Sequence, residues 1–525
     1  MLWLRPLLLT LELMSLSVAV AVAIGVTLAF ALSLLRRENR LQAAVFWVCV
    51  IGIVGTLATP MVMHAAAWES TAGKFGWMSL TQTSARTYSG FAGRYSGMFA
   101  CVWIHGLFGT AIVALATLYG TARIERAVID LARCDGGPVW GWWRVRLPIA
   151  RNWMVFSALA TAVLAASEMT VVDLYGVRTV ADEFYLFHAA DPSWFSVFMV
   201  LVVPALIGVT LTAVAILRLF QPVNARIIDR GLKTSSEAEE AVGGFWQGLA
   251  SLFALGVTTL MFAFPLLGVI IKAGQQTMVV NDGGQSVVRV IWSVRRTTTV
   301  LVRALQEFSG EYQTTLLLAS CTAVLSALIA FLATSIAVER PRLRVYLDGL
   351  SVGCFLMPGP LVGLAIVRIF SVPLPGVSSL YQQSLVPTMI ALSFRALPVA
   401  YWVMRVAFSG IDAAVMDSAK MDLKWRTRLW TIERPLIGRA LGIAVTASAI
   451  VASGEVPSSL PVIPPGVVTV GTRLFGLLHS GARYQEASLA FWYLLFVVVA
   501  AVVLVRFVGG DGSAAIGSDR SNDVD

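Results

Sequence analysis

Acidic side chains recur in register at two places in the chain, and their chemistry is the first thing to explain. They match at a constant offset of 287 residues, as the pairs Asp130/Asp417, Asp135/Asp422 and Glu168/Glu455. Carboxylates can transfer protons, ligate metal ions or pair with basic residues of a partner. No H-E-x-x-H, C-x-x-C or paired-carboxylate arrangement accompanies these residues. We therefore predict residues that contact a partner, with no catalytic role and no metal site, in a chain that is not an enzyme.

The matched carboxylates belong to a longer internal match. Residues 125–168 align without gaps onto residues 412–455. Shared hydrophobicity does not explain the identities, which include Ala127/Ala414, Val128/Val415, Ala132/Ala419, Trp143/Trp430 and Pro148/Pro435 in addition to the acidic pairs. The sequence thus predicts a duplicated unit.

The elements that position these residues are predicted to be membrane helices. Hydrophobic residues make up 57% of the 525 residues and charged residues only 13%, against about 25% charged in soluble proteins. About eleven apolar stretches approach the ~20 residues that a helix needs to cross a bilayer. They are 11–35, 43–63, 98–119, 152–172, 194–217, 248–271, 313–338, 347–370, 386–407, 438–456 and 487–507.

The formal net charge of +9 is interpreted as a topology signal and not as a sign of nucleic-acid binding. Lys and Arg gather between predicted spans, at 36–40, 123–151, 218–233, 340–344 and 420–439. Placing these loops in the cytoplasm puts the N-terminus outside. Six predicted helices then separate the two matched segments, so both face the same compartment.

We therefore predict an all-α, multi-pass membrane protein made of two parallel repeats. The first unit is 1–220 with about five spans, and the second is 248–508 with about six. Residues 221–247 are predicted to be a cytoplasmic linker, and the polar residues 509–525 a disordered tail.

Each matched segment begins with a polar loop of about thirty residues between two membrane helices. In the first loop, Glu125, Ile129 and Ala132 have helical spacing, and Gly136 with Pro138 is expected to end that helix. A second short helix is expected at 140–146. Such a helix–turn–helix can act as a rigid lever at the membrane surface.

Here the sequence resembles the permeases of binding-protein-dependent ABC importers. Their signature has an acidic residue, two small residues, a glycine and an I-x-L-P-like ending. The first loop matches it at Asp130, Ala132, Gly136, Val145, Leu147 and Pro148, and the second at Asp417, Ser418, Ala419, Ile432 and Pro435. Leu131, Leu423 and Arg434 depart from it. Residues 168–185 and 454–466 further resemble fused permeases of the ferric-iron type, although that family usually has six helices per half.

The resemblance implies that the loops are coupling helices that dock on two copies of an ABC ATPase subunit. An extracytoplasmic solute-binding protein would deliver the solute, iron(III) or a similar inorganic ion being favoured over thiamine, a polyamine or an oxyanion. ATP would be used by the partner, because this chain has no phosphate-binding loop, and the chain itself is expected to bind no cofactor. The location implied is the bacterial inner membrane. The coupling residues implied are Glu125, Ala127, Asp130, Ala132, Asp135, Gly136, Pro148, Asp412, Ala414, Asp417, Ala419, Asp422 and Pro435.

Glu168 and Glu455 lie at matching depths, near the ends of the membrane helices that follow the loops. Intramembrane carboxylates usually face a cavity or a partner, so the two could form an outer gate. The alternative is that each caps its helix at the interface, which Pro457 favours in the second copy. The intramembrane arginines Arg368, Arg395 and Arg405 are expected to extend toward an interface.

Two other functions remain open on the sequence alone. An ion-coupled secondary transporter should have interrupted helices with intramembrane charges. A membrane scaffold without transport would not need the same polar loop twice in register.

Overall fold

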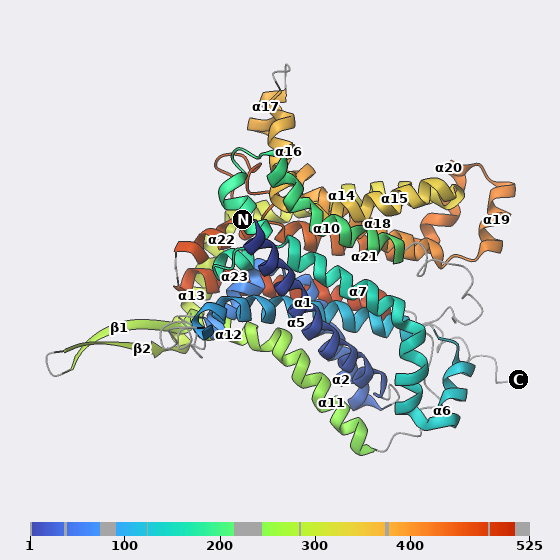
Figure 1. Cartoon of the computed structure of the whole chain (residues 1–525), viewed down its shortest axis with the longest axis horizontal. Coiled ribbons are helices and arrows are strands. Elements are labelled where there is room, and N and C mark those ends of the chain that lie inside the picture. Colours follow the sequence, from blue (N-terminus) through green and yellow to red (C-terminus); the bar gives the residue numbers. More distant parts are fainter. Residues whose placement is uncertain are drawn as a thin grey trace, which may run out of the picture.

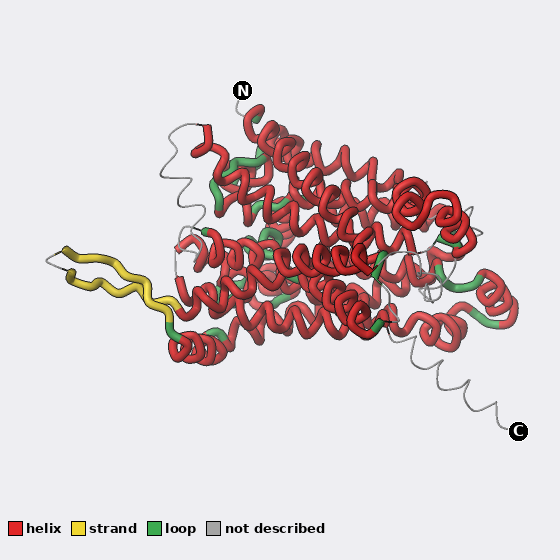
Figure 2. The backbone as a smooth tube through the Cα atoms, turned by 90° about the horizontal axis from the view of Figure 1, so that it is seen from below, coloured by secondary structure: helices red, strands yellow, loops and turns green. Residues whose placement is uncertain are grey.

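The computed structural model describes residues 3–35, 39–73, 91–122, 124–214, 244–282, 285–372, 377–480 and 483–509. Most of these residues are helical, and the longest helices run side by side in one bundle (Figures 1 and 2). The predicted linker up to residue 243 and the predicted tail from residue 510 lie outside the described residues. Several basic residues used for the topology prediction also lie outside them, namely Arg36, Arg37, Arg123, Arg218, Arg226, Arg230 and Lys233.

Nine helical segments among the described residues are long and apolar enough to cross a membrane. They are Leu4–Ser33, Arg40–Ala58, Gly97–Ala122, Ala127–Ser167, Gly244–Ala273, Ser309–Glu339, Val386–Ser409, Trp425–Gly454 and Tyr484–Val505. A shorter apolar helix, Trp194–Thr210, accounts for another predicted span. The helical, multi-pass character predicted from the sequence is confirmed.

The predicted span at 347–370 is wrong as a single straight helix. Two helices, α15 (Pro341–Leu356) and α16 (Gly359–Phe370), meet there at 100°. Pro358 precedes α16, and Met357 before it has extended backbone angles. A proline disfavours helical geometry at the preceding residue and has no N–H to donate, which explains the break.

The same kind of break shortens the predicted span at 43–63. Helix α2 (Arg40–Ala58) ends two residues before Pro60, and α3 (Met61–Ala72) begins directly after it. Pro60 and Pro358 are both N-cap residues with extended backbone angles. The pairs α2–α3 and α15–α16 are therefore built in the same way.

Six long helices form two packed sets of three. In the first set α1 (Leu4–Ser33), α5 (Phe91–Ala122) and α7 (Leu147–Ser167) contact one another. In the second set the members in contact are α14 (Ser309–Glu339), α18 (Val386–Ser409) and α21 (Arg434–Gly454). Small residues allow close approach: a Cβ added to Gly25 of α1 would lie 2.9 Å from the Thr110 carbonyl oxygen of α5.

The long helix that follows each set also packs against the other half of the chain. Helix α10 (Trp194–Val214) packs on α7 and on α15. Helix α23 (Arg483–Gly509) packs on α21 and on α2. The two halves therefore share one packed bundle.

One further membrane helix has no counterpart among the described residues of the first half. It consists of α11 (Gly244–Thr258), a π-helical turn η5 (Thr259–Ala263) and α12 (Phe264–Gly274). Its first part packs on α1 and α2, and its second part packs on α3 and α23.

A two-stranded hairpin follows α12, in the region between the predicted spans 248–271 and 313–338. Strands β1 (Gln275–Asp282) and β2 (Gln285–Trp292) pair antiparallel, and the hairpin projects away from the bundle (Figure 1). Helix α13 (Val294–Glu307) then leads into α14. The other short elements are α8 (Thr170–Leu174), α9 (Val180–Glu183), η2 (Phe184–His188), α17 (Val377–Gln383) and α22 (Val470–Ser480).

Candidate functional site

The first matched loop, residues 125–148, is a helix that bends sharply and then enters the membrane helix. Helix α6 (Arg126–Gly141) follows Glu125 as its N-cap. Gly137 interrupts it with a positive φ of 78°, a conformation that glycine adopts without strain. A π-helical turn η1 (Trp142–Arg146) then continues into α7. The predicted break is confirmed one residue after Gly136, whereas the predicted separate helix at 140–146 is joined to α7.

The second matched loop, residues 412–435, has the same plan with different local contacts. Asp412 caps α19 (Ala413–Asp422) by accepting a hydrogen bond from the Ala414 backbone N–H at 3.0 Å. Leu423, which stands where the first loop has Gly136, is extended, so no glycine is required there. Helix α20 (Trp425–Arg428) and the π-helical turn η6 (Leu429–Glu433) then lead into α21.

The element boundaries of the two loops keep the offset found in the sequence. Corresponding boundaries are each 287 residues apart. The N-caps are Glu125 and Asp412, and the π-helical turns start at Trp142 and Leu429. The membrane helices start at Leu147 and Arg434 and end at Ser167 and Gly454. Helices α6 and α19 lie at the same end of the bundle, away from the hairpin (Figure 1).

Most of the predicted coupling residues lie on the surface. The exposed ones are Glu125, Ala127, Asp135, Gly136, Pro148, Asp412, Ala414, Asp417, Asp422 and Pro435. Asp130 is half-exposed, with a carboxylate oxygen 3.7 Å from a guanidinium nitrogen of Arg133, and Asp417 pairs with Lys420 at 2.9 Å. Ala132 and Ala419 are buried instead. Buried side chains cannot contact a partner directly.

Exposed apolar side chains accompany the carboxylates and are not among the predicted coupling residues. On the first loop they are Leu131, Val139, Trp140 and Trp143, and on the second Val415, Met421 and Trp430. Met421, at 85% exposure, is the most open of them. Apolar and aromatic groups bordered by charges are typical of protein-binding surfaces. Their predicted position in loops at the membrane surface is the feature of the sequence from which these residues could have been identified.

The two loops are fixed to their bundles by different chemistry. In the first, the buried Trp142 packs against Phe30 at the end of α1, with ring centroids 5.0 Å apart. In the second, Arg428 pairs with the buried Glu433 at 2.8 Å and with Glu339 at the end of α14. Ser335 of α14 also donates a hydrogen bond to Glu433.

Glu168 and Glu455 lie at the far ends of α7 and α21, each as the residue that ends its helix. Glu168 accepts hydrogen bonds from the backbone N–H groups of Thr170 and Val171, and Glu455 accepts one from Ser458 at 3.3 Å. Each glutamate therefore ends its helix, as the alternative above expects, but its carboxylate caps the turn that follows and not the helix itself.

Each glutamate also faces a basic side chain from the neighbouring helix of its set. His105 of α5 lies 3.6 Å from Glu168, and Arg395 of α18 lies 3.8 Å from Glu455. No described contact joins Glu168 to Glu455, so their role as a gate stays a prediction.

The arginine predictions need a correction. Arg395 and Arg405 are buried and paired inside the bundle, Arg405 with Asp348 at 3.4 Å. Their carboxylate partners compensate the charge, so neither side chain extends to an interface. Arg368, in the last turn of α16, is exposed as expected.

The geometry bears on two chemical possibilities, metal binding and a serine nucleophile. Among the described residues, no group of three or more His, Cys, Asp or Glu side chains could hold a metal ion. The chain contains one G-x-S-x-G stretch, at 349–353, but it lies within α15, and its Ser351 is buried. A serine nucleophile in that motif needs a strand-to-helix turn.

No protein-family profile matches the chain, and no curated protein sequence matches it.

Proposed function

We propose that the chain is the membrane permease of an ABC importer, carrying two parallel copies of the transmembrane unit and driven by separate ATP-hydrolysing subunits. The observation that carries the proposal is the pair of matched loops. Both lie at one end of the bundle, both expose acidic and apolar side chains, and both continue directly into a membrane helix.

The geometry supports a mechanical role for these loops. Each π-helical turn joins its loop to a membrane helix of 21 residues, about 30 Å long, that ends at Glu168 or Glu455. Movement of a docked ATPase pair would tilt α7 and α21 together and change the bundle at its opposite end. Such a transition needs two packed states whose balance depends on the nucleotide bound by the partner.

The solute is proposed to be a small one delivered by an extracytoplasmic binding protein. The resemblance of residues 168–185 and 454–466 to ferric-iron permeases favours iron(III) or a similar inorganic ion, with thiamine, a polyamine or an oxyanion as alternatives. The bacterial inner membrane is the proposed location.

Buried charges favour one second candidate, an ion-coupled transporter. Asp348 and Arg405 pair within the bundle, as do Lys272 of α12 and Glu486 of α23. Buried ionisable groups in membrane helices often mark ion pathways. Because each of these charges has an opposite partner, a structural role explains them as well, and the ABC permease remains the better-supported function.

The decisive experiment is co-purification with a nucleotide-hydrolysing subunit from a host membrane that expresses the full chain. The double variant Asp130→Arg, Asp417→Arg should reduce the retained ATPase by about tenfold or more, since like-charge contacts at an interface cost several kcal/mol. Asp191→Arg is the matched control, because Asp191 is an exposed carboxylate outside the loops.

Retention of the ATPase by the double variant would overturn the assignment of these loops as docking sites. Absence of any ATPase, together with solute uptake driven by an ion gradient in proteoliposomes, would overturn the ABC proposal in favour of the ion-coupled transporter.

A further inference from the structure

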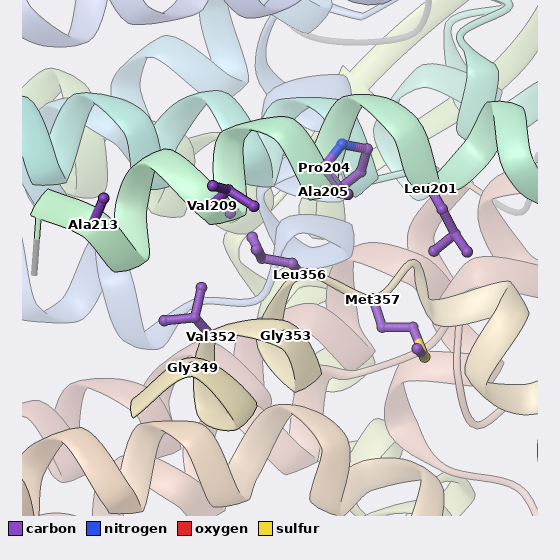
Figure 3. Close-up of a pocket in the computed structure, with 11 residues that line it drawn as sticks. Leu201, Pro204, Ala205, Val209, Ala213, Gly349, Val352, Gly353, Leu356 and Met357 are labelled. Atoms are coloured by element: carbon purple, nitrogen blue, oxygen red, sulfur yellow. The ribbon is translucent and has the colours of Figure 1, made fainter. Parts of the chain in front are cut away.

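An open apolar groove runs between α10 and α15, where the two halves of the chain meet (Figure 3). Its volume is about 570 Å³, and its lining is formed entirely by apolar residues. Leu201, Ala205 and Val209 line it from α10, and Val352, Gly353 and Met357 line it from the α15 side. The groove lining has no charged side chain. Helix α10 contains the apolar helix Trp194–Thr210, and α15 together with α16 is long and apolar enough to cross a membrane.

The corresponding face on the other side of the bundle is the one between α2 and α23. Helices α2 and α15 both end just before an N-cap proline that starts the next helix. Gly55 of α2 lies five residues before Pro60, and Gly353 of α15 lies five residues before Pro358. Helices α10 and α23 are likewise the helices that cross to the other half. The two glycines therefore occupy corresponding positions.

These corresponding glycines have different surroundings. A Cβ added to Gly55 would lie 3.1 Å from the ring of Phe262, which belongs to the helix formed by α11, η5 and α12. A Cβ added to Gly52 would lie 2.3 Å from Thr258 of the same helix. By contrast, a Cβ added to Gly353 would meet no atom within 4 Å. The α2 face is thus covered by a closely packed helix, and the α15 face is open.

We propose that the groove between α10 and α15 is the binding site for one membrane-spanning helix of a partner protein. That helix would contact α10 and α15 as α11–α12 contacts α23 and α2. The partner's helix would present an uncharged face, because the lining has no charged side chain, and an aromatic or branched side chain opposite Gly353, as Phe262 lies opposite Gly55. The inference rests on the matched halves that underlie the proposed function.

The experiment uses the full chain in native membranes with a photo-crosslinking amino acid at Val209, in the groove. Val324, an exposed residue of α14 outside the groove lining, is the control position. We expect a protein adduct of discrete mass at position 209 and not at 324. Mass spectrometry should identify in it a single apolar span of about 20 residues. That span, made synthetically, should bind the purified chain reconstituted in lipid.

Variants at Gly353 test whether the groove itself is the binding site. Gly353→Leu places a side chain in the open space and should weaken binding of the synthetic span by about tenfold, as overpacking an interface does. Gly353→Ala adds only the Cβ for which there is room, and should leave binding nearly unchanged. Co-purification of the ATPase should be the same in both variants, which checks that each is folded.

Three results would overturn the inference: adducts with phospholipid only, the same protein adduct at both positions, or equal binding by Gly353→Leu and the unmodified chain. Failure of the proposed function is distinguishable, because it would abolish ATPase co-purification and leave the adduct at position 209 in place.

Discussion

Buried carboxylates in this chain differ in whether a basic side chain pairs with them. Glu433 has Arg428, Asp348 has Arg405, and Glu486 has Lys272. Asp182 of α9 is 2% exposed, and its Oδ1 atom accepts no hydrogen bond. An unpaired buried carboxylate favours its protonated form. The charge state of Asp182 should therefore affect stability.

Burial, followed by the nearby Asp173 carboxylate, raises the pKa of Asp182 from its ordinary value of 3.8 to about 7. A raised folded-state pKa means that the stability present below pH 4 is lost as the pH rises through 7, by about 4 kcal/mol at most. We expect Asp182→Asn to raise the thermal unfolding temperature at pH 8 and to change it little at pH 4, measured in lipid nanodiscs.

Asp191→Asn serves as the control for this titration, because Asp191 is exposed and should give no pH-dependent difference. An equal effect of Asp182→Asn at pH 4 and pH 8 would contradict the proposed protonation of Asp182.

At the scale of the element, the two matched loops differ in backbone geometry. The first turns at Gly137 with φ of 78°, and the second turns through extended residues at Leu423 and Lys424. Both routes bring the chain into a π-helical turn at the same relative position. The bend in the first loop therefore depends on a single glycine, whereas the bend in the second does not.

Gly137→Ala should destabilise the first loop by about 1–3 kcal/mol, because Gly137 has φ of 78° and ψ of 175°, a conformation that essentially only glycine adopts. It should also reduce binding of the proposed ATPase subunit, because the loop helix would change direction. Gly438→Ala is the matched control: Gly438 lies inside α21, and an added Cβ meets no atom within 4 Å. That variant should be neutral or slightly stabilising. The two variants are compared by thermal unfolding and by the ATPase retained, and equal behaviour would argue against the bend at Gly137.

Long apolar runs made most membrane helices predictable, because a helix in lipid must satisfy its own backbone hydrogen bonds. The break at Pro358 was missed because hydropathy does not register the effect of proline on the preceding residue. The β1–β2 hairpin was missed although Asp282-Gly283-Gly284 is a recognisable turn sequence. The buried positions of Arg395 and Arg405 depend on Glu455 and Asp348, tens of residues away, which no local pattern reports.

At the scale of the whole molecule, the two ends of the helical bundle carry different segments of the chain. The matched loops share one end of the bundle, and the segment between α7 and α10 lies at the other end of those helices (Figure 1). In a membrane, the two ends face different compartments. The orientation of the whole chain can therefore be measured at single residues.

We expect Asp130→Cys and Asp417→Cys to react with a membrane-impermeant maleimide from the same side of sealed vesicles. Asp191→Cys should react only from the opposite side. The background needs Cys134 replaced, since it is an exposed native cysteine near the first site. Labelling of positions 130 and 417 from opposite sides would contradict the arrangement on which the proposed function depends.

The contrast between the two anchors, an aromatic stack at Trp142 and Phe30 and a set of ion pairs at Arg428, Glu433 and Glu339, has an evolutionary consequence. In a homodimer every mutation appears in both subunits, so the two anchors would have to change together. A single polypeptide that contains both lets selection act on each anchor separately. One loop can then tolerate changes in sequence that the other loop does not share.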